Sequence, residues 1–274
     1  MIAKEELNIL WSLEQTAEKY EDRVAVSDVN QELTWKGLVK KAQVIGAELS
    51  KKVQPGNPIP VLLEKSSETL AVMLGIVYAG CFYVPVNPMN PAERLRKIME
   101  KLEPEVIISD EKGKEQLAAV GVGLEEKVIG PEILLPTTGT DLSEEQRSKL
   151  LEQIQGQWKE TDALYGIFTS GSTGTPKAIV VSHGAVSRFV RHFTEIFEIT
   201  SEDVIGNQAP FDFDVSVKDI YSSIMTGAQL VLIPKEYFST PPRLLDYLCD
   251  KKVTNLTWAV SALTLVSALK GLNY

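Results

Sequence analysis

A nine-residue segment, Thr169-Ser170-Gly171-Ser172-Thr173-Gly174-Thr175-Pro176-Lys177, combines glycines, hydroxyl side chains and one lysine. Glycine lets the backbone approach a ligand closely, and backbone N–H groups, hydroxyls and an ammonium are groups that bind polyphosphates. The segment lies between two apolar, strand-like runs, 163–168 and 179–181. This order predicts a loop that holds the phosphates of a nucleotide.

The spacing within this loop differs from the common nucleotide-binding motifs. A Walker A loop requires G-x-x-x-x-G-K-[ST], whereas Lys177 lies three residues after Gly174 and is followed by Ala178. Gly171 and Gly174 do not fit the G-x-G-x-x-G spacing either. A surface loop or linker is the alternative interpretation, since Ser/Thr/Gly-rich segments often have that role. The strand-like runs on both sides favour the phosphate loop.

A second segment, 208–221, holds two carboxylates, Asp212 and Asp214, in an apolar context. One interpretation is structural, because Asp and Ser are good helix N-caps and the spacing predicts a helix over 216–225. The other is ligand binding, because an ammonium that leaves water needs a carboxylate partner. Both interpretations stay open for Asp212.

Composition excludes several classes of function. The chain has 274 residues and a formal net charge of −9, which argues against a nucleic-acid-binding surface. No apolar run approaches the roughly 20 residues of a membrane span, and we expect a cytoplasmic protein. Two cysteines and two histidines give no disulfide framework or zinc spacing, so we expect no metal site within the chain. His183 is predicted to start a helix and make a structural hydrogen bond.

Helical spacing alternates with short apolar runs along the chain, which predicts an α/β fold with parallel-rich sheets flanked by helices. We divide the chain into a first α/β part (1–110), a connecting insertion on the surface (111–160) and a second α/β part with the nucleotide loop (161–274). The expected strands are 24–26, 33–35, 59–63, 82–86, 106–108, 163–168, 179–181, 230–233 and 253–260; the expected helices are 9–20, 38–49, 69–78, 93–102, 143–158 and 216–225.

The nucleotide loop resembles the phosphate-binding signature of the adenylate-forming superfamily of AMP-dependent synthetases and ligases, with Ala178 where that family usually has glycine. The run 78–86 is similar to its A-G-[AG]-x-[FY]-V-P-[IVL] block. The run 87–94 is similar to D-P-x-x-P-x-E-R, with Asn87 in place of the acid. We interpret both runs as scaffold.

Phe213-Asp214-Val215-Ser216 resembles the F-D-x-S motif of amino-acid-activating members, and the stretch 208–221 looks most like D-alanine–carrier protein ligase. The resemblance implies that the carboxylate of Asp214 pairs with the substrate ammonium. It also implies a reaction in which ATP, with Mg²⁺, activates an amino acid as aminoacyl-AMP for transfer to a phosphopantetheine carrier protein. The residues it assigns to the ATP phosphates are Thr169, Ser170, Gly171, Ser172, Thr173, Gly174 and Lys177, with Lys177 also neutralising developing charge.

The resemblance assigns Asp214, Val215, Lys218 and Thr257 to the amino-acid pocket. Lys218 stands at a position that is usually apolar or aromatic, which leads to the hypothesis of an acidic substrate side chain. The alternative is a lysine whose stem packs while its ammonium reaches solvent. For Thr257 the match is partial, because the family's nearby proline is absent from this chain.

The resemblance covers only the N-terminal part of the family's enzymes. The Y-G-P-T-E motif, whose glutamate binds Mg²⁺ in relatives, and the C-terminal lid domain with its lysine are not found. We therefore expect this chain alone to be inactive or nearly so. Two other functions stay open: a fragment of an acyl- or aryl-CoA ligase, against which Asp214 argues, and a non-catalytic nucleotide-binding remnant or partner chain.

Overall fold

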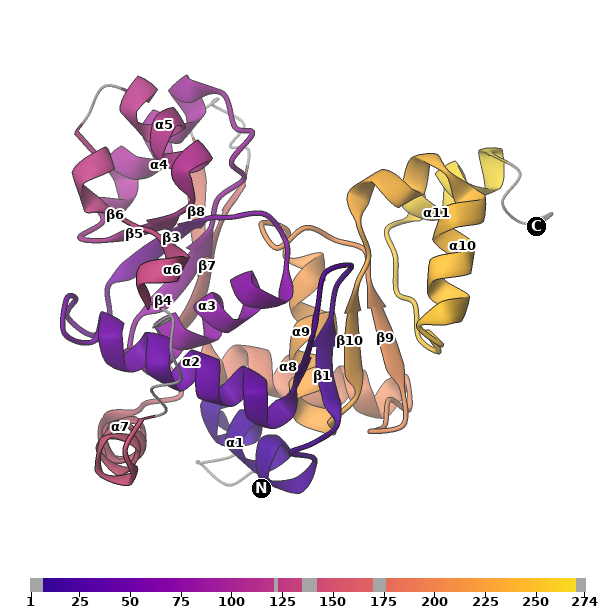
Figure 1. The fold of residues 1–274 in the computed structure, drawn as a ribbon, viewed down its shortest axis with the longest axis horizontal. Helices are drawn as coiled ribbons and strands as arrows, with labels where there is room; N and C mark the ends of the chain where they lie inside the picture. The colour runs from indigo at the N-terminus through magenta and orange to yellow at the C-terminus, as the bar shows by residue number, and fades with distance from the viewer. Residues whose placement is uncertain (1–6, 121–122, 135–141, 170–175, 270–274) are drawn as a thin grey trace.

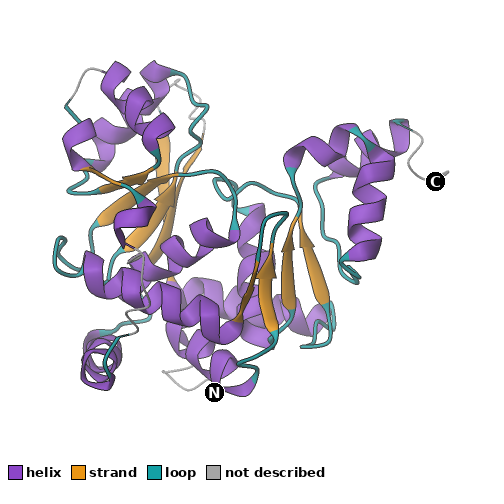
Figure 2. Ribbon diagram, viewed as in Figure 1, coloured by secondary structure: helices purple, strands orange, loops and turns teal. Residues whose placement is uncertain are grey.

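The structure of the chain is a computed structural model that describes residues 7–120, 123–134, 142–169 and 176–269, without the side chains of 153–157. It contains two sheets with strand orders β2-β1-β10-β9 and β6-β5-β3-β4-β7-β8. Helices lie against both sheets (Figures 1 and 2). Among the described strand pairs, β1–β2 and β7–β8 are antiparallel and the others are parallel. The predicted α/β class with parallel-rich sheets is therefore confirmed.

The four-stranded sheet joins a hairpin near the start of the chain to two strands about 200 residues later. The hairpin of β1 (Val24–Ser27) and β2 (Glu32–Thr34) pairs with β10 (Gln229–Leu232), which in turn pairs with β9 (Val204–Asn207). Val26 lies opposite Leu230 in this register. The sheet thus takes strands from both of the expected α/β parts.

The six-stranded sheet also draws on both parts. Its strands are β3 (Pro58–Leu62), β4 (Phe82–Pro85), β5 (Ile107–Ser109), β6 (Val128–Ile129), β7 (Ala163–Thr169) and β8 (Lys177–Ser182). β6 and β8 are its two edges. β7 ends at Thr169 and β8 begins at Lys177, so this sheet holds the two described ends of the predicted nucleotide loop.

One hydrophobic core connects the two sheets. It includes buried residues of β1, β3, β4 and β10 and of helices that pack between and around the sheets. These helices are α1 (Ile9–Lys19), α2 (Trp35–Leu49), α3 (Ser67–Tyr78), α8 (His183–Ile196) and α9 (Val215–Thr226). Each begins close to its predicted position.

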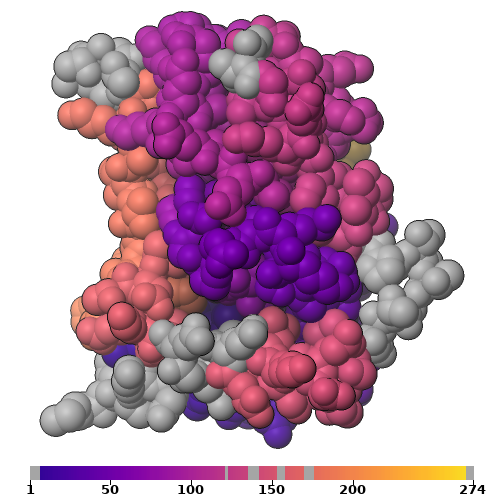
Figure 3. Space-filling model, turned by 90° about the vertical axis from the view of Figure 1, so that its left-hand side faces the viewer, coloured from indigo at the N-terminus to yellow at the C-terminus, as the bar shows by residue number. Residues whose placement is uncertain are grey.

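Two smaller cores lie at the ends of the molecule. One is formed around β5 by α4 (Ala92–Leu102) and α5 (Glu111–Val120), in the upper part of the face seen in Figure 3. The other joins η3 (Lys235–Ser239), α10 (Pro241–Asp250) and α11 (Val260–Ala268), beside β9 in Figure 1. None of the described helices is long and apolar enough to cross a membrane.

Two stretches differ from the sequence-based description. The expected strand at 253–260 is wrong, because its backbone makes a single bridge, Asn255 to Ile205, and α11 begins at Val260. Within 111–160, α5 and β6 belong to the layers of the six-stranded sheet. The short helices η2 (Glu125–Lys127) and α6 (Pro131–Leu134) flank β6, and α7 (Glu144–Gln157) follows.

The start of α7 is as the sequence predicts. Ser143 and Gln146 exchange hydrogen bonds between their side chains and backbone N–H groups and so form a capping box where the predicted helix 143–158 begins. The three-part division of the chain itself stays a prediction.

Candidate functional site

The nucleotide loop connects two antiparallel strands whose ends are paired. Thr169, the last residue of β7, lies opposite Lys177, the first residue of β8, and both are exposed. Five other predicted phosphate-binding residues, Ser170, Gly171, Ser172, Thr173 and Gly174, lie outside the described residues. Because these two residues are paired, the described ends of the predicted loop lie side by side at the end of the β7–β8 hairpin.

One face of the β7–β8 hairpin leads from this loop to a small pocket. Residues directly opposite each other on antiparallel strands share a face, and that face recurs every second residue. The pairs Thr169–Lys177, Ile167–Ile179 and Tyr165–Val181 therefore lie along one face. Tyr165 and Val181 line a pocket of about 330 Å³, roughly 13 Å from Thr169 at 3.3 Å per residue.

Asp214 contributes the carboxylate of this pocket. It lies at the N-cap position of α9, and its side chain makes no capping hydrogen bond to the helix. It is exposed, and the rest of the lining is apolar or aromatic: Tyr165, Val181, Ala185, Val186, Phe189 and Val217. Burial, and then the charge of Asp214, raise the pKa of Tyr165. A carboxylate in an otherwise apolar pocket suits an ammonium ligand, because an ammonium that leaves water needs a carboxylate partner.

Asp212 has a different environment. It is half-buried, and burial raises its pKa, although a hydrogen bond from Asn87 and the charge of Arg94 act in the opposite direction. Arg94 also donates a hydrogen bond of 3.4 Å to the carbonyl of Phe168, next to the nucleotide loop. The run that we interpreted as scaffold thus contacts both chemical segments and connects them.

Lys218 and Thr257 lie together, but neither lines the pocket of Asp214. The ammonium of Lys218 is 2.6 Å from Asp219 Oδ1 and donates to the carbonyl of Thr257 at 2.8 Å. Its side chain is 11% exposed, so the ammonium lies in a buried ion pair rather than in solvent. Val215, the first residue of α9, is half-buried and also stands outside the pocket lining.

Sequence reasoning missed Lys65, which lies between β3 and α3. Its ammonium donates to three backbone carbonyls at the end of β9 and in the connection toward α9. A charged residue three positions after the end of a buried parallel strand is the signal that could have drawn attention to it, because open α/β sheets bind ligands at that edge.

His183 has the structural role that the sequence predicts. It is the first residue of α8, and it is 3% exposed. Its Nδ1 accepts a hydrogen bond of 3.3 Å from the backbone N–H of Ile9, and its ring packs against Trp158. Burial lowers its pKa to about 3, so the ring is neutral at physiological pH.

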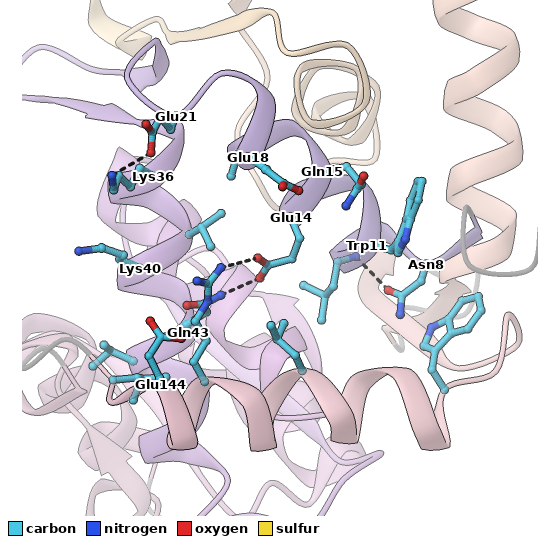
Figure 4. A pocket seen from close by; sticks show the side chains of 18 residues that line it. Asn8, Trp11, Glu14, Gln15, Glu18, Glu21, Lys36, Lys40, Gln43 and Glu144 are labelled. Atoms are coloured by element: carbon cyan, nitrogen blue, oxygen red, sulfur yellow. Dashed lines mark hydrogen bonds and ion pairs between the residues drawn. The ribbon is translucent and has the colours of Figure 1, made fainter.

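A larger pocket, of about 800 Å³, lies between α1, α2 and α7 (Figure 4). Glu14 is at its centre and receives hydrogen bonds from Gln43 at 2.7 Å and Arg147 at 3.5 Å. The pocket contains no residue of the nucleotide loop or of the 208–221 segment. It is therefore separate from the candidate site.

A sequence profile described as AMP-binding enzyme matches residues 13–272, which is nearly the whole chain. The chain belongs to this family. Membership confirms the resemblance that the nucleotide loop indicated, and it makes the chain part of a ligase-type enzyme family whose members use ATP.

The relatives of this family member include tyrocidine and syringomycin synthases. Tyrocidine synthase 1 of Brevibacillus parabrevis is 29% identical over 92% of the chain, and syringomycin synthase SyrB1 of Pseudomonas syringae pv. syringae is 28% identical over 90%. The chain spans 22% and 38% of their lengths, respectively. It thus corresponds to a minor part of these curated relatives.

Solved structures show the same fold at lower identity. The nonribosomal peptide synthetase FmoA3 (S1046A) in its AMPPNP-bound form has a TM-score of 0.79 and 24% identity, over 95% of the chain and 26% of FmoA3. The complex of VinN with L-aspartate has a TM-score of 0.78 and 22% identity, over 96% of the chain and 70% of VinN.

Two of the residues predicted to bind ATP phosphates lie within the described ranges, whereas those ranges contain no ready-made site for a metal ion. Lys177 and Thr169 are both exposed at the ends of the predicted loop, so their side chains are accessible to a ligand. Within the described ranges there is no group of three or more His, Cys, Asp or Glu side chains that could hold a metal. Mg²⁺ commonly enters such sites on the nucleotide phosphates, with few protein ligands.

Proposed function

We propose that the chain forms the part of an amino-acid-adenylating ligase that binds the ATP phosphates and the substrate ammonium. The observation that supports this is the shared face of the β7–β8 hairpin, with Lys177 at one end and the pocket of Asp214 at the other. A roughly 13 Å separation along the strands leaves room between them for the reacting carboxylate and the α-phosphate.

In the proposed reaction, a carboxylate oxygen of the amino acid attacks the α-phosphorus of ATP, and the bond to pyrophosphate breaks. The carrier's phosphopantetheine thiol then attacks the acyl carbon, and AMP leaves. In-line displacement depends on positioning and charge neutralisation more than on acid–base chemistry. Lys177 and the loop hold the phosphates, while Asp214 orients the substrate through its ammonium. Mg²⁺ bound to the phosphates would supply further neutralisation.

The substrate class is an amino acid, and the hypothesis of an acidic side chain still depends on Lys218. Because Asp219 already neutralises the ammonium of Lys218, an acidic substrate would have to compete with that carboxylate. VinN has been solved with L-aspartate, and the 208–221 stretch looks like D-alanine–carrier protein ligase, so both amino acids belong in a substrate panel.

The test is amino-acid-dependent exchange between ATP and pyrophosphate, in the 274-residue chain and in the longest natural reading frame that contains it. The panel is D-alanine, L-alanine, glycine, serine, aspartate and glutamate, with a fatty acid as control. Exchange with one amino acid is the expected result in the longer reading frame, and little or none is expected in the 274-residue chain alone. Exchange with the fatty acid alone would favour an acyl-CoA ligase, and nucleotide binding without any exchange would favour a non-catalytic protein.

Asp214→Asn sharpens this test because it removes the charge and keeps the size of the side chain. We expect amino-acid-dependent exchange to fall roughly 100-fold, since the substrate ammonium loses its partner. Asp110→Asn is the matched control, because Asp110 also precedes a helix and is exposed. Equal activity of the two variants would contradict the role of Asp214.

A further inference from the structure

The connection between β3 and α3 reaches across to the other sheet through one side chain, that of Lys65. Its Nζ lies 3.2 Å from the carbonyl oxygens of Asn207 and Gln208, 3.5 Å from that of Ala209 and 3.2 Å from Asn207 Oδ1. These three residues end β9 and begin the connection to α9. Lys65 therefore holds the start of the segment that carries Asp214.

An ammonium suits this position because it has three donors and no acceptor. Three successive carbonyls converge on Lys65, and successive carbonyls of a strand normally point to opposite sides. The convergence shows that the backbone leaves the β conformation after Asn207. An apolar side chain at position 65 would leave the carbonyls of Gln208 and Ala209 without this donor.

The same cluster extends into α9. Asn207 Nδ2 donates to Asp219 Oδ2 at 3.0 Å, and Asp219 Oδ1 accepts from Lys218 at 2.6 Å. Asn207 and Asp219 are 0% and 2% exposed. Lys65 thus begins a buried polar network that joins the end of β9 to the second turn of α9.

The short stretch between Ala209 and Asp214 transmits this anchorage. Phe211 is buried in the main core. The N–H of Phe213 donates to the carbonyl of Pro210 at 3.2 Å, and both N–H and Oγ of Ser216 donate to the carbonyl of Phe213. The connection is therefore a compact turn that cannot absorb a displacement at its start.

We propose that Lys65 is a positioning residue that fixes segment 207–214, and through it the carboxylate of Asp214, where the substrate ammonium binds. The role of Asp214 in this statement rests on the proposed function. The placement of the segment by Lys65 rests only on the contacts of Lys65 and can be measured without any substrate.

The contacts of Lys65 depend on pH, because its ammonium can lose a proton. Burial lowers the pKa of Lys65 to about 8, while the charges of Asp219 and Glu236 act in the opposite direction. The neighbouring cation, Lys218, is paired with Asp219. As pH rises through about 8, Lys65 loses its charge and one of its three donors, whereas an arginine would stay charged.

The first test compares backbone hydrogen exchange, by mass spectrometry, in Lys65→Met and the parent chain. We expect peptides within 210–217 to exchange roughly tenfold faster in the variant, because local opening becomes easier. Lys112→Met is the matched control, since Lys112 pairs with Glu64 beside Lys65 but is 58% exposed. Identical exchange of 210–217 in both variants would overturn the proposal. If Lys65→Met does not fold, Lys65→Gln takes its place, with the same expectation and the same criterion.

The second test uses the exchange assay in the longest natural reading frame. Lys65→Met should raise the KM for the amino acid by roughly 10- to 100-fold, as expected for a small misplacement of a binding group, and leave the KM for ATP nearly unchanged. In the parent, the amino-acid KM should rise above about pH 8, where Lys65 loses its charge. Lys65→Arg should keep the amino-acid KM of the parent at pH 7 and should show a smaller rise above about pH 8.

Two results of the second test would refute the positioning role. One is an equal change in both KM values in Lys65→Met, and the other is a pH profile of Lys65→Arg identical to that of the parent. If the parent shows no exchange with any amino acid, the proposed function fails, and the hydrogen-exchange test alone decides the role of Lys65.

Discussion

Asp28 links the N-terminal hairpin to helix α3, and its substitution by asparagine provides a quantitative test of the fold. Asp28 follows β1 and is 7% exposed. One carboxylate oxygen accepts from the N–H groups of Asn30 and Gln31 at 2.7 and 3.0 Å. The other accepts from the N–H and Oγ of Ser67, the first residue of α3, at 2.8 and 2.7 Å. The carboxylate therefore connects the N-terminal hairpin to the first turn of α3.

The expected magnitude follows from these hydrogen bonds. Asparagine keeps one acceptor oxygen for Asn30 and Gln31, but its amide then faces Ser67. The hydroxyl of Ser67 can rotate and accept a hydrogen bond, whereas its N–H cannot. One hydrogen bond is lost, and the remaining ones are made to a neutral amide instead of a charged carboxylate. Hydrogen bonds to charged groups contribute roughly 1.5–3 kcal/mol each. We expect Asp28→Asn to lower the free energy of unfolding by about 2–3 kcal/mol at pH 7.

The assay is urea unfolding of the parent chain and Asp28→Asn between pH 7 and pH 3, with Asp110→Asn as control. Burial opposes ionisation of Asp28, but its hydrogen bonds outweigh burial and lower its pKa. Because the folded pKa is depressed, this stabilisation is present above the unfolded value of about 3.9 and is lost as pH falls below it. A difference under about 0.5 kcal/mol at pH 7, or one that stays constant to pH 3, would refute the reasoning.

Three further predictions concern single residues. Lys177→Ala should weaken ATP use roughly 10- to 100-fold without changing the urea midpoint, because the side chain is exposed at the loop; unchanged kinetics would contradict its role. Lys218→Met should lower the free energy of unfolding by about 3 kcal/mol, since it leaves the buried Asp219 without its ion pair, and an unchanged order of substrates would rule out the acidic-substrate hypothesis. Stability should fall as pH drops from about 6.5 toward 3, because unfolded histidine binds a proton that buried His183 does not; the slope should be smaller in His183→Gln, as measured by urea unfolding.

Local elements of the fold could be predicted from the sequence, whereas strand pairing could not. The helical spacing of 9–20 and the apolar run 59–63 correspond to α1 and β3, because these signals depend on nearby residues. Pairing of β1 with β10 depends on residues far apart in the chain, so no local pattern indicates it. The wrong strand at 253–260 has the same origin: its β-branched residues favour extended backbone, but it makes only one bridge to β9.

The candidate site shows the same limit. Thr169 and Lys177 could be placed at one loop because glycine and hydroxyl residues form a continuous motif between two strands. The partners of Lys218 could not be predicted, since a buried ion pair with its own neighbour leaves no periodic signal. Lys65 contacts residues in another sheet, and its role depends on their carbonyls rather than on any side-chain motif.

The closure of the four-stranded sheet by the N-terminal hairpin has a consequence for how the chain folds. Thr16 in α1 donates a hydrogen bond to the carbonyl of Ile224, 208 residues later, close to where β10 begins. Because β1 pairs with β10, the edge of β1 that faces β10 stays unpaired during synthesis until most of the chain has left the ribosome. Bringing such distant segments together has a high entropic cost of loop closure. Folds that depend on contacts between distant residues therefore fold slowly. An unpaired strand edge is also a site for association with other chains, so early folding intermediates of this protein expose an aggregation-prone edge that the finished structure covers.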